Sequence, residues 1–330
     1  LPSAPSATES TAAASTAPDS TALETTAASS GDTRIVETSF GDIELPVDPQ
    51  RVIALDEYAA MNLLAVGIEP METYTAYSSL VSQDILAERG VELMAQEDSF
   101  AVNFEAIAGS DPDVIVVTAE SAVVESVEPL QDIAPTVIVP YTAPWRDVIT
   151  DTGNLFGRTD EAASVIEALE GKLASTSEAV AANPYSLSIL GETFGILFAV
   201  SPEAVLSAIV DEVGVDRPPA QADATSMEGF NSVISLSPEL VVDHDADVVT
   251  VMSGVFYPED ALLDLPTYQS LPAVQDGRST IVDGDMWFGT HPFAIYWILE
   301  DLASLAEGVD GIGTIDDAED RWSAYQELLG

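Results

Sequence analysis

The chain has 330 residues, more than one small core requires and enough for two domains of roughly 150 residues each. Its 57 acidic and 9 basic residues give a net charge of −48, which excludes nucleic acid as a partner because such binding needs Lys and Arg to neutralise phosphates. Cysteine is absent, so disulfides, thiolate nucleophiles and cysteine-ligated metals are excluded as well.

The acidity does not predict a disordered chain, because 47% of the residues are hydrophobic and can form proper cores. No run of about 18 apolar residues occurs, so the sequence predicts no membrane-spanning helix. We interpret the charge as the surface of a folded protein that works in salty surroundings, where ions shorten the reach of charge repulsion to under about 10 Å.

Residues 1–33 are almost entirely Ser, Thr, Ala and Pro, with no bulky apolar residue between Leu1 and Leu23. Such a segment cannot form a core, so we expect a flexible tether. The chain has neither an initiator Met nor a signal peptide, and we expect that a targeting segment has been removed. A tether before a folded domain is typical of a surface lipoprotein, although the lipid-anchored cysteine that it needs is not in this chain.

From Arg34 onward, short apolar strands alternate with helical patterns. In residues 34–144 we predict strands at 51–55, 71–74, 113–118 and 135–139, and helices at 58–66 and 103–108. Alternation of this kind predicts an α/β fold, in which a central parallel sheet is covered on both faces. We expect this part to form an N-terminal, Rossmann-like lobe.

Residues 145–183 predict two successive helices that are broken near Gly157 and Arg158. In the second helix, apolar residues recur every three or four positions, at Ala163, Ile166, Leu169 and Leu173. A helix of about 22 residues would span roughly 33 Å, comparable with the width of a domain. One helix that joins two lobes restricts hinge motion, so we expect a stiff connection and a small ligand-induced closure.

Residues 184–330 repeat the alternation and predict a C-terminal α/β lobe. The predicted strands are 186–192, 195–200, 247–252 and 279–282, and the main helices are 204–213 and 293–306. Ser237 followed by Pro238 and Glu239 predicts a helix start, because Ser caps helices, Pro suits the first position and an acid suits the first turn.

Ordered blocks run through residues 34–306: Gly41-Asp-Ile-Glu-Leu-Pro, Asp48-Pro-Gln-Arg-Val-Ile-Ala-Leu, Leu63-Leu-Ala-Val-Gly-Ile-Glu-Pro, Asn103-Phe-Glu-Ala-Ile-Ala, Asp111-Pro-Asp-Val-Ile-Val, Ile133-Ala-Pro-Thr-Val, Ile234-Ser-Leu-Ser-Pro-Glu and Leu271-Pro-Ala-Val-Gln-Asp-Gly-Arg. Their order resembles the ABC-transporter substrate-binding proteins for ferric siderophores, haem and cobalamin, the class III periplasmic binding proteins. Tyr141-Thr-Ala-Pro-Trp-Arg and Asp285-Met-Trp-Phe-Gly are more similar to the ferric siderophore branch than to the cobalamin branch.

The resemblance implies a non-enzymatic carrier, with two α/β lobes on one long helix and a ligand held between the lobes. Independently, ligands of open α/β sheets bind beyond the carboxyl ends of the strands, where this chain carries many aromatic residues. The predicted ligand-binding residues are Tyr58, Tyr74, Tyr77, Phe100, Tyr141, Trp145 and Arg146 in the first half, and Phe194, Phe198, Trp287, Phe288 and His291 in the second. The same loops carry Asp56 and Tyr257.

Some of these residues have a second interpretation. Arg146 is the favoured anchor for the ligand, but it could equally be a surface arginine that pairs with a neighbouring acid such as Asp147. Phe194 and Phe198 flank the turn at Gly195, and Phe198 would belong to the core if it points inward. Tyr74 and Tyr77 either line the site or cap the first lobe.

We predict no cofactor and no metal ligands, because the iron of a ferric siderophore is already fully coordinated. His244 and His291 are the only histidines, and they lack the spacing of a metal site. His291 is expected near the ligand. The scarcity of basic residues favours a near-neutral ferric hydroxamate or mixed chelate over a strongly anionic catecholate.

The resemblance further implies docking to ABC permease subunits through acidic residues on the outer face of each lobe. The usual first-lobe position is Met61 here, so we assign docking to Glu57, and to Glu203, Asp211 and Glu212 in the second lobe. We expect a monomer outside the cytoplasm, either periplasmic or held at the cell surface by a lipid anchor that this chain lacks.

Two other classes of function remain open from the residues alone. The chain has no phosphate-binding loop, dinucleotide fingerprint or nucleophile elbow, so an enzyme would depend on carboxylates for acid–base work. A surface protein that binds another protein or a polysaccharide is the third interpretation. Within the resembling family, haem and cobalamin are the alternative ligands, and Tyr74, Tyr77 or His291 would be the candidate axial ligands of haem.

Overall fold

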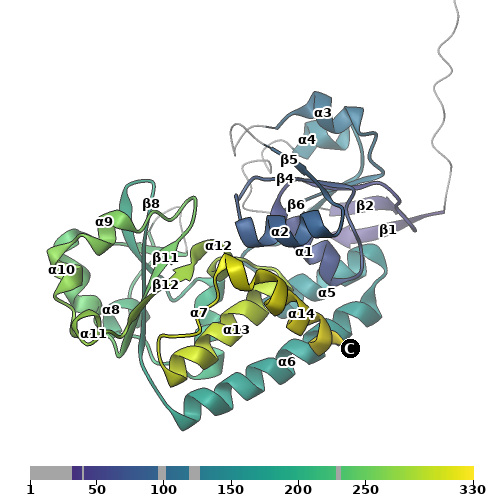
Figure 1. The fold of residues 1–330 in the computed structure, drawn as a ribbon. Coiled ribbons are helices and arrows are strands. Elements are labelled where there is room, and N and C mark those ends of the chain that lie inside the picture. Colours follow the sequence, from purple (N-terminus) through teal and green to yellow (C-terminus); the bar gives the residue numbers. More distant parts are fainter. Residues whose placement is uncertain (1–31, 39–40, 96–101, 119–126, 228–231) are drawn as a thin grey trace, which may run out of the picture. The chain divides into compact units, whose positions relative to one another are not determined.

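Two five-stranded sheets organise the chain in the computed structural model, which describes residues 32–38, 41–95, 102–118, 127–227 and 232–330 (Figure 1). The two lobes built on these sheets confirm the α/β expectation. Most of the segment predicted as a tether lies outside the described residues, and Thr33 already begins the antiparallel hairpin of β1 (Thr33–Thr38) and β2 (Gly41–Pro46). No helix in the described part of the chain is long and apolar enough to cross a membrane.

The first sheet is entirely parallel and has the order β5-β4-β3-β6-β7. Its strands are β3 (Val52–Ala54), β4 (Glu72–Tyr74), β5 (Glu92–Met94), β6 (Val114–Thr118) and β7 (Thr136–Val139). Alternate residues of β6 enter different hydrophobic clusters, with Val114 and Val116 on one face and Ile115 and Val117 on the other. Burial on both faces explains why these strands are continuous apolar runs. The covering helices are α1 (Glu57–Ala65), α2 (Leu80–Glu88), α3 (Phe104–Gly109) and α4 (Val127–Gln131).

The second sheet has the order β10-β9-β8-β11-β12 and is mixed. Its strands are β8 (Leu187–Thr193), β9 (Ile196–Val200), β10 (Val233–Ser235), β11 (Val248–Ser253) and β12 (Ser279–Asp283). β9 runs antiparallel to both of its neighbours, β8 and β10. For β8 this follows from the connection, because only Phe194 and Gly195 separate the two strands. A parallel connection would need a crossover of a dozen or more residues.

The short helices of the second lobe are α7 (Val205–Val213), α8 (Pro219–Ala222), η2 (Pro238–His244), α9 (Asp260–Leu263), α10 (Pro266–Gln269), α11 (Pro272–Gln275) and α12 (Gly284–Trp287). The predicted start at Pro238 is correct in position, but the helix is of the 3₁₀ type. Ser237 is extended there and its side chain makes no capping hydrogen bond. The helix therefore begins where we predicted, but without the predicted serine cap.

The helical stretch between the sheets is α5 (Trp145–Phe156) followed by α6 (Thr159–Ala182), which confirms the predicted break. Gly157 ends α5 with φ of 67°, a left-handed conformation that glycine adopts without steric cost. With 24 residues at 1.5 Å each, α6 is about 36 Å long. It packs along α13 (Pro292–Glu307), a helix with 11 buried residues among its 16.

The chain ends with η3 (Ile315–Asp317) and α14 (Ala318–Leu329), a helix that we did not predict. α14 contacts α2 of the first lobe as well as α6 and α13. The guanidinium of Arg89, at the end of α2, lies 4.4 Å from the ring centroid of Trp322 in α14. The last helix of the chain therefore covers part of the first lobe.

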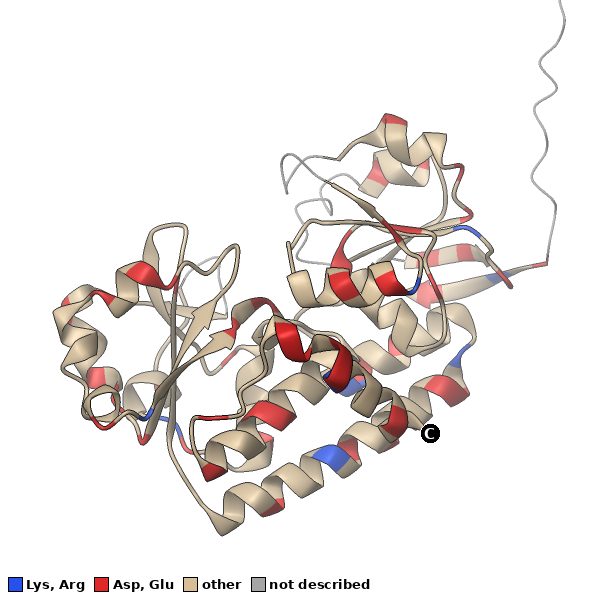
Figure 2. Cartoon of the chain, viewed as in Figure 1, with Lys and Arg blue, Asp and Glu red and all other residues tan. Residues whose placement is uncertain are grey.

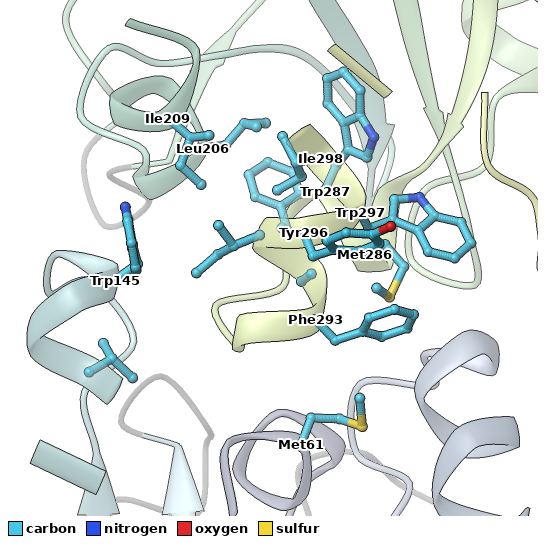
Figure 3. Packing of buried hydrophobic residues seen from close by; sticks show 14 of the residues in the cluster. Met61, Trp145, Leu206, Ile209, Met286, Trp287, Phe293, Tyr296, Trp297 and Ile298 are labelled. Atoms are coloured by element: carbon cyan, nitrogen blue, oxygen red, sulfur yellow. The ribbon is translucent and has the colours of Figure 1, made fainter. Parts of the chain in front are cut away.

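One hydrophobic cluster extends through both lobes. Figure 3 shows Met61 of α1 beneath Phe293 of α13, with Tyr296, Trp297 and Trp287 above. Met61 is only 1% exposed and belongs to this shared core. The position that is usually acidic in the resembling family thus holds an apolar residue because its side chain faces the inside of this protein.

Candidate functional site

Residues that follow the strands of one sheet meet residues that follow the strands of the other. From the first sheet these are Tyr58 after β3, Tyr77 after β4 and Tyr141 after β7. From the second they are Tyr257 after β11, and Asp285, Phe288 and His291 after β12. We call this set the lobe boundary. Its position fits the rule that places ligands of open α/β sheets beyond the carboxyl ends of the strands.

Two hydrogen bonds join the sheets at the lobe boundary. The hydroxyl of Tyr58 donates to the main-chain oxygen of Asp285 at 2.9 Å, and the hydroxyl of Tyr141 donates to that of Phe288 at 3.1 Å. Both acceptors are carbonyl groups at or beside α12. Two tyrosines from different strands of the first sheet therefore hold one short segment of the second lobe.

The aromatic rings form a nearly continuous series across the boundary. Tyr58 stacks on Tyr77 with ring centroids 4.3 Å apart, and Tyr141 lies 6.3 Å away on nearly parallel planes. On the other side, Tyr257 stacks on Phe288 at 5.4 Å. Such pairs stabilise by about 0.5–1.5 kcal/mol beyond their buried area. Their flat faces also suit a ligand with extended apolar or conjugated surface.

Phe194 is the most exposed aromatic residue near this edge, with 66% of its surface accessible. It occupies the first position of the β8–β9 turn with φ of 51°, and Gly195 follows with φ of 78°. A two-residue turn of this type requires positive φ at both positions, which is rare for a bulky side chain. The ring of Phe194 contacts Phe256, whose centroid is 6.0 Å away. A strained and exposed aromatic residue such as Phe194 is typical of a functional surface.

Phe198 lies four residues further along the same hairpin and is fully buried. Its ring rests against the backbone of Gly191 in β8, where a Cβ atom would come within 2.5 Å of the ring. Its ring also contacts two residues of the lobe boundary, Tyr257 and Phe288, with centroids 6.3 and 6.1 Å away. The structure therefore places Phe198 in the core, which was its alternative interpretation.

Four carboxyl groups are buried close to the lobe boundary: Asp56, Glu57, Asp283 and Asp285. Asp56 caps α1 by accepting from Ala59 N at 2.7 Å, and it also accepts from both the backbone and the hydroxyl of Thr118. Glu57 accepts from Tyr77 N at 2.8 Å and from Gln83 at 2.9 Å. Both residues thus position loops of the first sheet.

Asp285 lies in α12, and its carboxyl group packs on the backbone of Gly254, where a Cβ atom would come within 2.7 Å of its Oδ2. Burial, with the nearby charges of Asp283 and Glu57, raises the pKa of Asp285 to about 8. Burial also raises the pKa of Glu57 to about 7. These groups carry an unfavourable negative charge when they ionise, because water is excluded from around them.

Six of the nine basic residues form ion pairs among the described residues, and none of these pairs involves the four carboxyls close to the lobe boundary. Arg34, Arg89 and Arg217 instead donate hydrogen bonds to main-chain oxygens. Arg146 stacks on Trp145 at 4.0 Å and forms ion pairs with Glu170 and Glu212, each at 3.0 Å. Figure 2, in which the ribbon is coloured by residue type, shows how few basic positions lie among the acidic ones. The structure thus gives Arg146 acidic partners, although not Asp147.

His291 caps α13, since its Nδ1 accepts from Ala294 N at 3.2 Å. It is fully buried, and burial lowers the pKa of its imidazole to about 3, so the ring is neutral. Its ring lies 5.7 Å from that of Tyr58. His244 lies at the end of η2 instead. The described residues contain no group of three or more His, Asp or Glu side chains that could hold a metal ion.

Other predicted site residues lie away from the boundary rings or outside the described part of the chain. Tyr74 is buried in β4 within the cluster on the far face of the first sheet. Trp145 and Trp287 are 2% and 0% exposed and belong to the shared core. Phe100 lies outside the described residues.

The predicted docking residues differ in accessibility. Glu203, Asp211 and Glu212 are exposed at the surface around α7, where a partner could reach them, although Glu212 already pairs with Arg146. Glu57 is buried and bonded to Tyr77 and Gln83, so its carboxyl group faces the protein interior.

Sequence reasoning did not select Phe256, Tyr257 or Asp285 as site residues. A signal was present, because Gly254 and Gly284 bracket this region and a Cβ atom at either would collide with Asp285 or Tyr257. Glycines beside an aromatic or acidic residue after a strand mark a close approach of side chain to backbone.

The sequence profile described as "Periplasmic binding protein" matches residues 76–285. The chain is 25% identical over 276 residues to the "Probable siderophore-binding lipoprotein YfiY" of Bacillus subtilis, covering 78% of this chain and 83% of the relative. It is 24% identical over 291 residues to the "Ferric enterobactin-binding periplasmic protein FepB" of Escherichia coli, covering 82% of this chain and 90% of that protein.

Among solved structures, Staphylococcus aureus SirA complexed with staphyloferrin B superposes with a TM-score of 0.68 at 19% identity. The match covers 84% of this chain and 99% of SirA, which establishes the same two-lobed fold. The profile match spans more than half of the chain and includes the loops that carry Tyr77, Tyr141, Phe194 and Tyr257. The chain therefore belongs to the periplasmic binding protein family, and it is a substrate-binding protein of the ABC transporter type rather than an enzyme.

Proposed function

We propose that this protein works outside the cytoplasm, captures a ferric siderophore at the lobe boundary and delivers it to an ABC importer. The observation that carries the proposal is the meeting of aromatic residues from both sheets at the carboxyl ends of their strands. A ferric siderophore is a bulky chelate whose iron is already coordinated. The protein therefore needs complementary surface and hydrogen-bonding groups rather than metal ligands.

The ligand would lie against the exposed Phe194 and the half-buried Phe256 on one side, and against Tyr77 and Tyr141 on the other. The stack of Tyr257 on Phe288 would form the base of the site between them. The names of two relatives support an iron chelate as the ligand class. YfiY is described as a probable siderophore-binding lipoprotein and FepB as a ferric enterobactin-binding protein.

Tryptophan fluorescence provides a direct test, because Trp287 lies two residues from Asp285 and is fully buried. A panel of ferric siderophores, their iron-free forms, haem and cobalamin should be titrated against the purified protein. We expect saturable quenching by at least one ferric siderophore at one-to-one stoichiometry. No response to any ferric chelate would contradict the proposal, and a Soret shift with haem would favour the haem alternative.

A pair of variants localises the site. Phe194→Ala should weaken binding of the ferric ligand several-fold, since one exposed aromatic contact is lost. Ile35→Ala is the matched control, because Ile35 is 75% exposed on β1, outside the lobe boundary. Equal affinity in the two variants would place the ligand elsewhere.

A further inference from the structure

The lobe boundary combines acidic groups with aromatic faces and contains no basic side chain among the described residues. Glu57 and Asp285 are 0% and 5% exposed and come from opposite lobes, yet the charge of Glu57 is one of the causes that raise the pKa of Asp285. The backbone N–H of Val255 is the hydrogen-bond donor to Asp285. A buried carboxyl without a cationic partner is costly once it ionises.

The rest of the molecule does not supply the missing cation. Arg146, the basic residue predicted for this role, is held by Glu170, Glu212 and the ring of Trp145. Arg321 pairs with Asp301, and Lys172 pairs with Glu300. The compensating charge for Glu57 and Asp285 must therefore be a proton, a solvent cation or part of a ligand.

The aromatic surroundings suit a positively charged ligand group. Tyr58 donates a hydrogen bond to the main-chain oxygen of Asp285, and the rings of Tyr77 and Tyr141 lie 4.3 and 6.3 Å from its own. Ring faces attract cations through their quadrupoles, by about 0.5–1 kcal/mol at exposed sites and about 2 when water is excluded. A bound cation would stabilise the ionised form of these two carboxyls, so a site of this kind favours a cationic chelate over an anionic one.

His291 provides a second and independent indication of a ligand. Because its Nδ1 accepts from Ala294 N, the ring proton of the neutral imidazole is on Nε2. That Nε2 is fully buried beside Tyr58 and has no acceptor among the described residues. A buried donor without an acceptor costs about 1–3 kcal/mol. An oxygen atom of a bound chelate would satisfy it.

We propose that the lobe boundary selects a ferric chelate that carries a positive charge, with Asp285 as the group that recognises the charge and the buried carboxyl of Glu57 as a second negative group that reinforces it. This inference rests on the proposed function and narrows its ligand class. A trihydroxamate chelate with a free ammonium group has the required chemistry, since it offers an ammonium to the carboxylates and hydroxamate oxygens to His291. A ferric triscatecholate, which carries several negative charges, is disfavoured.

The test uses two chelates that differ by a single charge. Ferrioxamine B carries one ammonium group, and its N-acetyl derivative keeps the same iron site but lacks that charge. Both are titrated against the full chain in molar salt, which confines attraction by the general acidic surface to about 3 Å. We expect the ammonium form to bind about tenfold more tightly, as a charge-assisted hydrogen bond to a buried carboxylate allows.

Variants assign the preference to its residues. Asp285→Asn and Glu57→Gln preserve shape and should reduce the tenfold preference to about twofold or less. Glu178→Gln removes the same charge from an exposed position on α6 and should leave the preference unchanged. Thermal unfolding of each variant confirms that it is folded before the affinities are compared.

The outcomes separate this inference from the proposed function. Equal affinity of wild-type protein for the two chelates overturns the charge selection while siderophore binding stands. A preference that survives in both Asp285→Asn and Glu57→Gln also overturns it, because the charge is then recognised elsewhere. If no ferric chelate of any charge binds, the proposed function itself fails, and the inference fails with it.

Discussion

The indole nitrogen of Trp287 donates a 2.8 Å hydrogen bond to Oδ2 of Asp301, whose carboxyl group is completely buried. The other carboxylate oxygen accepts from Gly313 N at 2.9 Å and pairs with Arg321 of α14 at 2.8 Å. One carboxylate thus connects the end of α12, next to Asp285, with the last helix of the chain. Because α14 also contacts α2, this network ties the lobe boundary to the rest of the fold.

Replacing Asp301 with Asn should lower the free energy of unfolding by about 3 kcal/mol, because it leaves the mostly buried Arg321 without its counter-charge. Urea denaturation of Asp301→Asn and of the exposed control Glu178→Gln measures the difference. If the two variants unfold within about 0.5 kcal/mol of each other, the network is not a stabilising element.

The strained turn at Phe194 predicts a conflict between stability and ligand binding. Phe194→Asn should raise the free energy of unfolding by about 0.5–1 kcal/mol, because Asn tolerates positive φ better than Phe. It should also weaken binding of the ferric ligand. Phe194→Ala separates the two effects, since it removes the ring but does not relieve the strain. Equal stability of the Asn and Ala variants would show that the turn stores no strain.

Stability should depend on pH through Asp285 and Glu57, whose pKa values rise to about 8 and about 7 on folding. The folded state then holds protons that the unfolded chain releases near pH 4, so stability falls as pH rises from about 5 to 8, by up to about 1.4 kcal/mol per pH unit for each group. Asp56 and Asp283, whose pKa values are also raised by burial, contribute in the same direction.

The variant Asp285→Asn separates the contribution of Asp285 from that of the other buried carboxyls. Tyr58 and Tyr257 do not interfere, because burial raises their pKa values far above the interval between pH 5 and pH 8. At pH 8 the variant should resist urea better than the wild type, and at pH 5 the two should unfold together. Glu178→Gln serves as the charge-matched control. Parallel pH profiles for wild type and Asp285→Asn would contradict the assignment of Asp285.

The net charge of −48 predicts that added salt stabilises the fold. Self-repulsion among surface acids should fall as NaCl increases, and the effect should level off near 1 M, where the screening length is about 3 Å. Thermal unfolding in an NaCl series, compared with sucrose at equal osmolality, measures it. A melting temperature that does not rise with NaCl, or that rises equally with sucrose, would contradict this explanation.

Much of the fold was predictable because its signals are local. The spacing of Leu169 and Leu173 identified α6, and unbroken apolar runs identified strands that are buried on both faces. α14 was missed because acids and polar residues surround Trp322 and Tyr325 in the sequence and dilute the helical pattern. Its apolar face is explained only by α2 and α13, which are distant in sequence.

The site was less predictable, because burial of single side chains depends on tertiary structure. Phe194 and Phe198 lie in one hairpin, yet one is exposed and the other fully buried. Trp145 and Trp287 occupy positions that the sequence presents as loop aromatics, and both belong to the core. Asp285 is one of 57 acids, and only contact with Gly254 and the opposite lobe distinguishes it.

The contact of Arg89 with Trp322 has a consequence for the order of folding. A ribosome produces the chain from its N-terminus. The face of α2 that α14 covers is therefore exposed to solvent until residues 318–329 have been synthesised. The first lobe, although it is made first, reaches its final packing only after α14 has been synthesised. Nascent chains that lack residues 318–329 should accordingly keep α2 open to proteases.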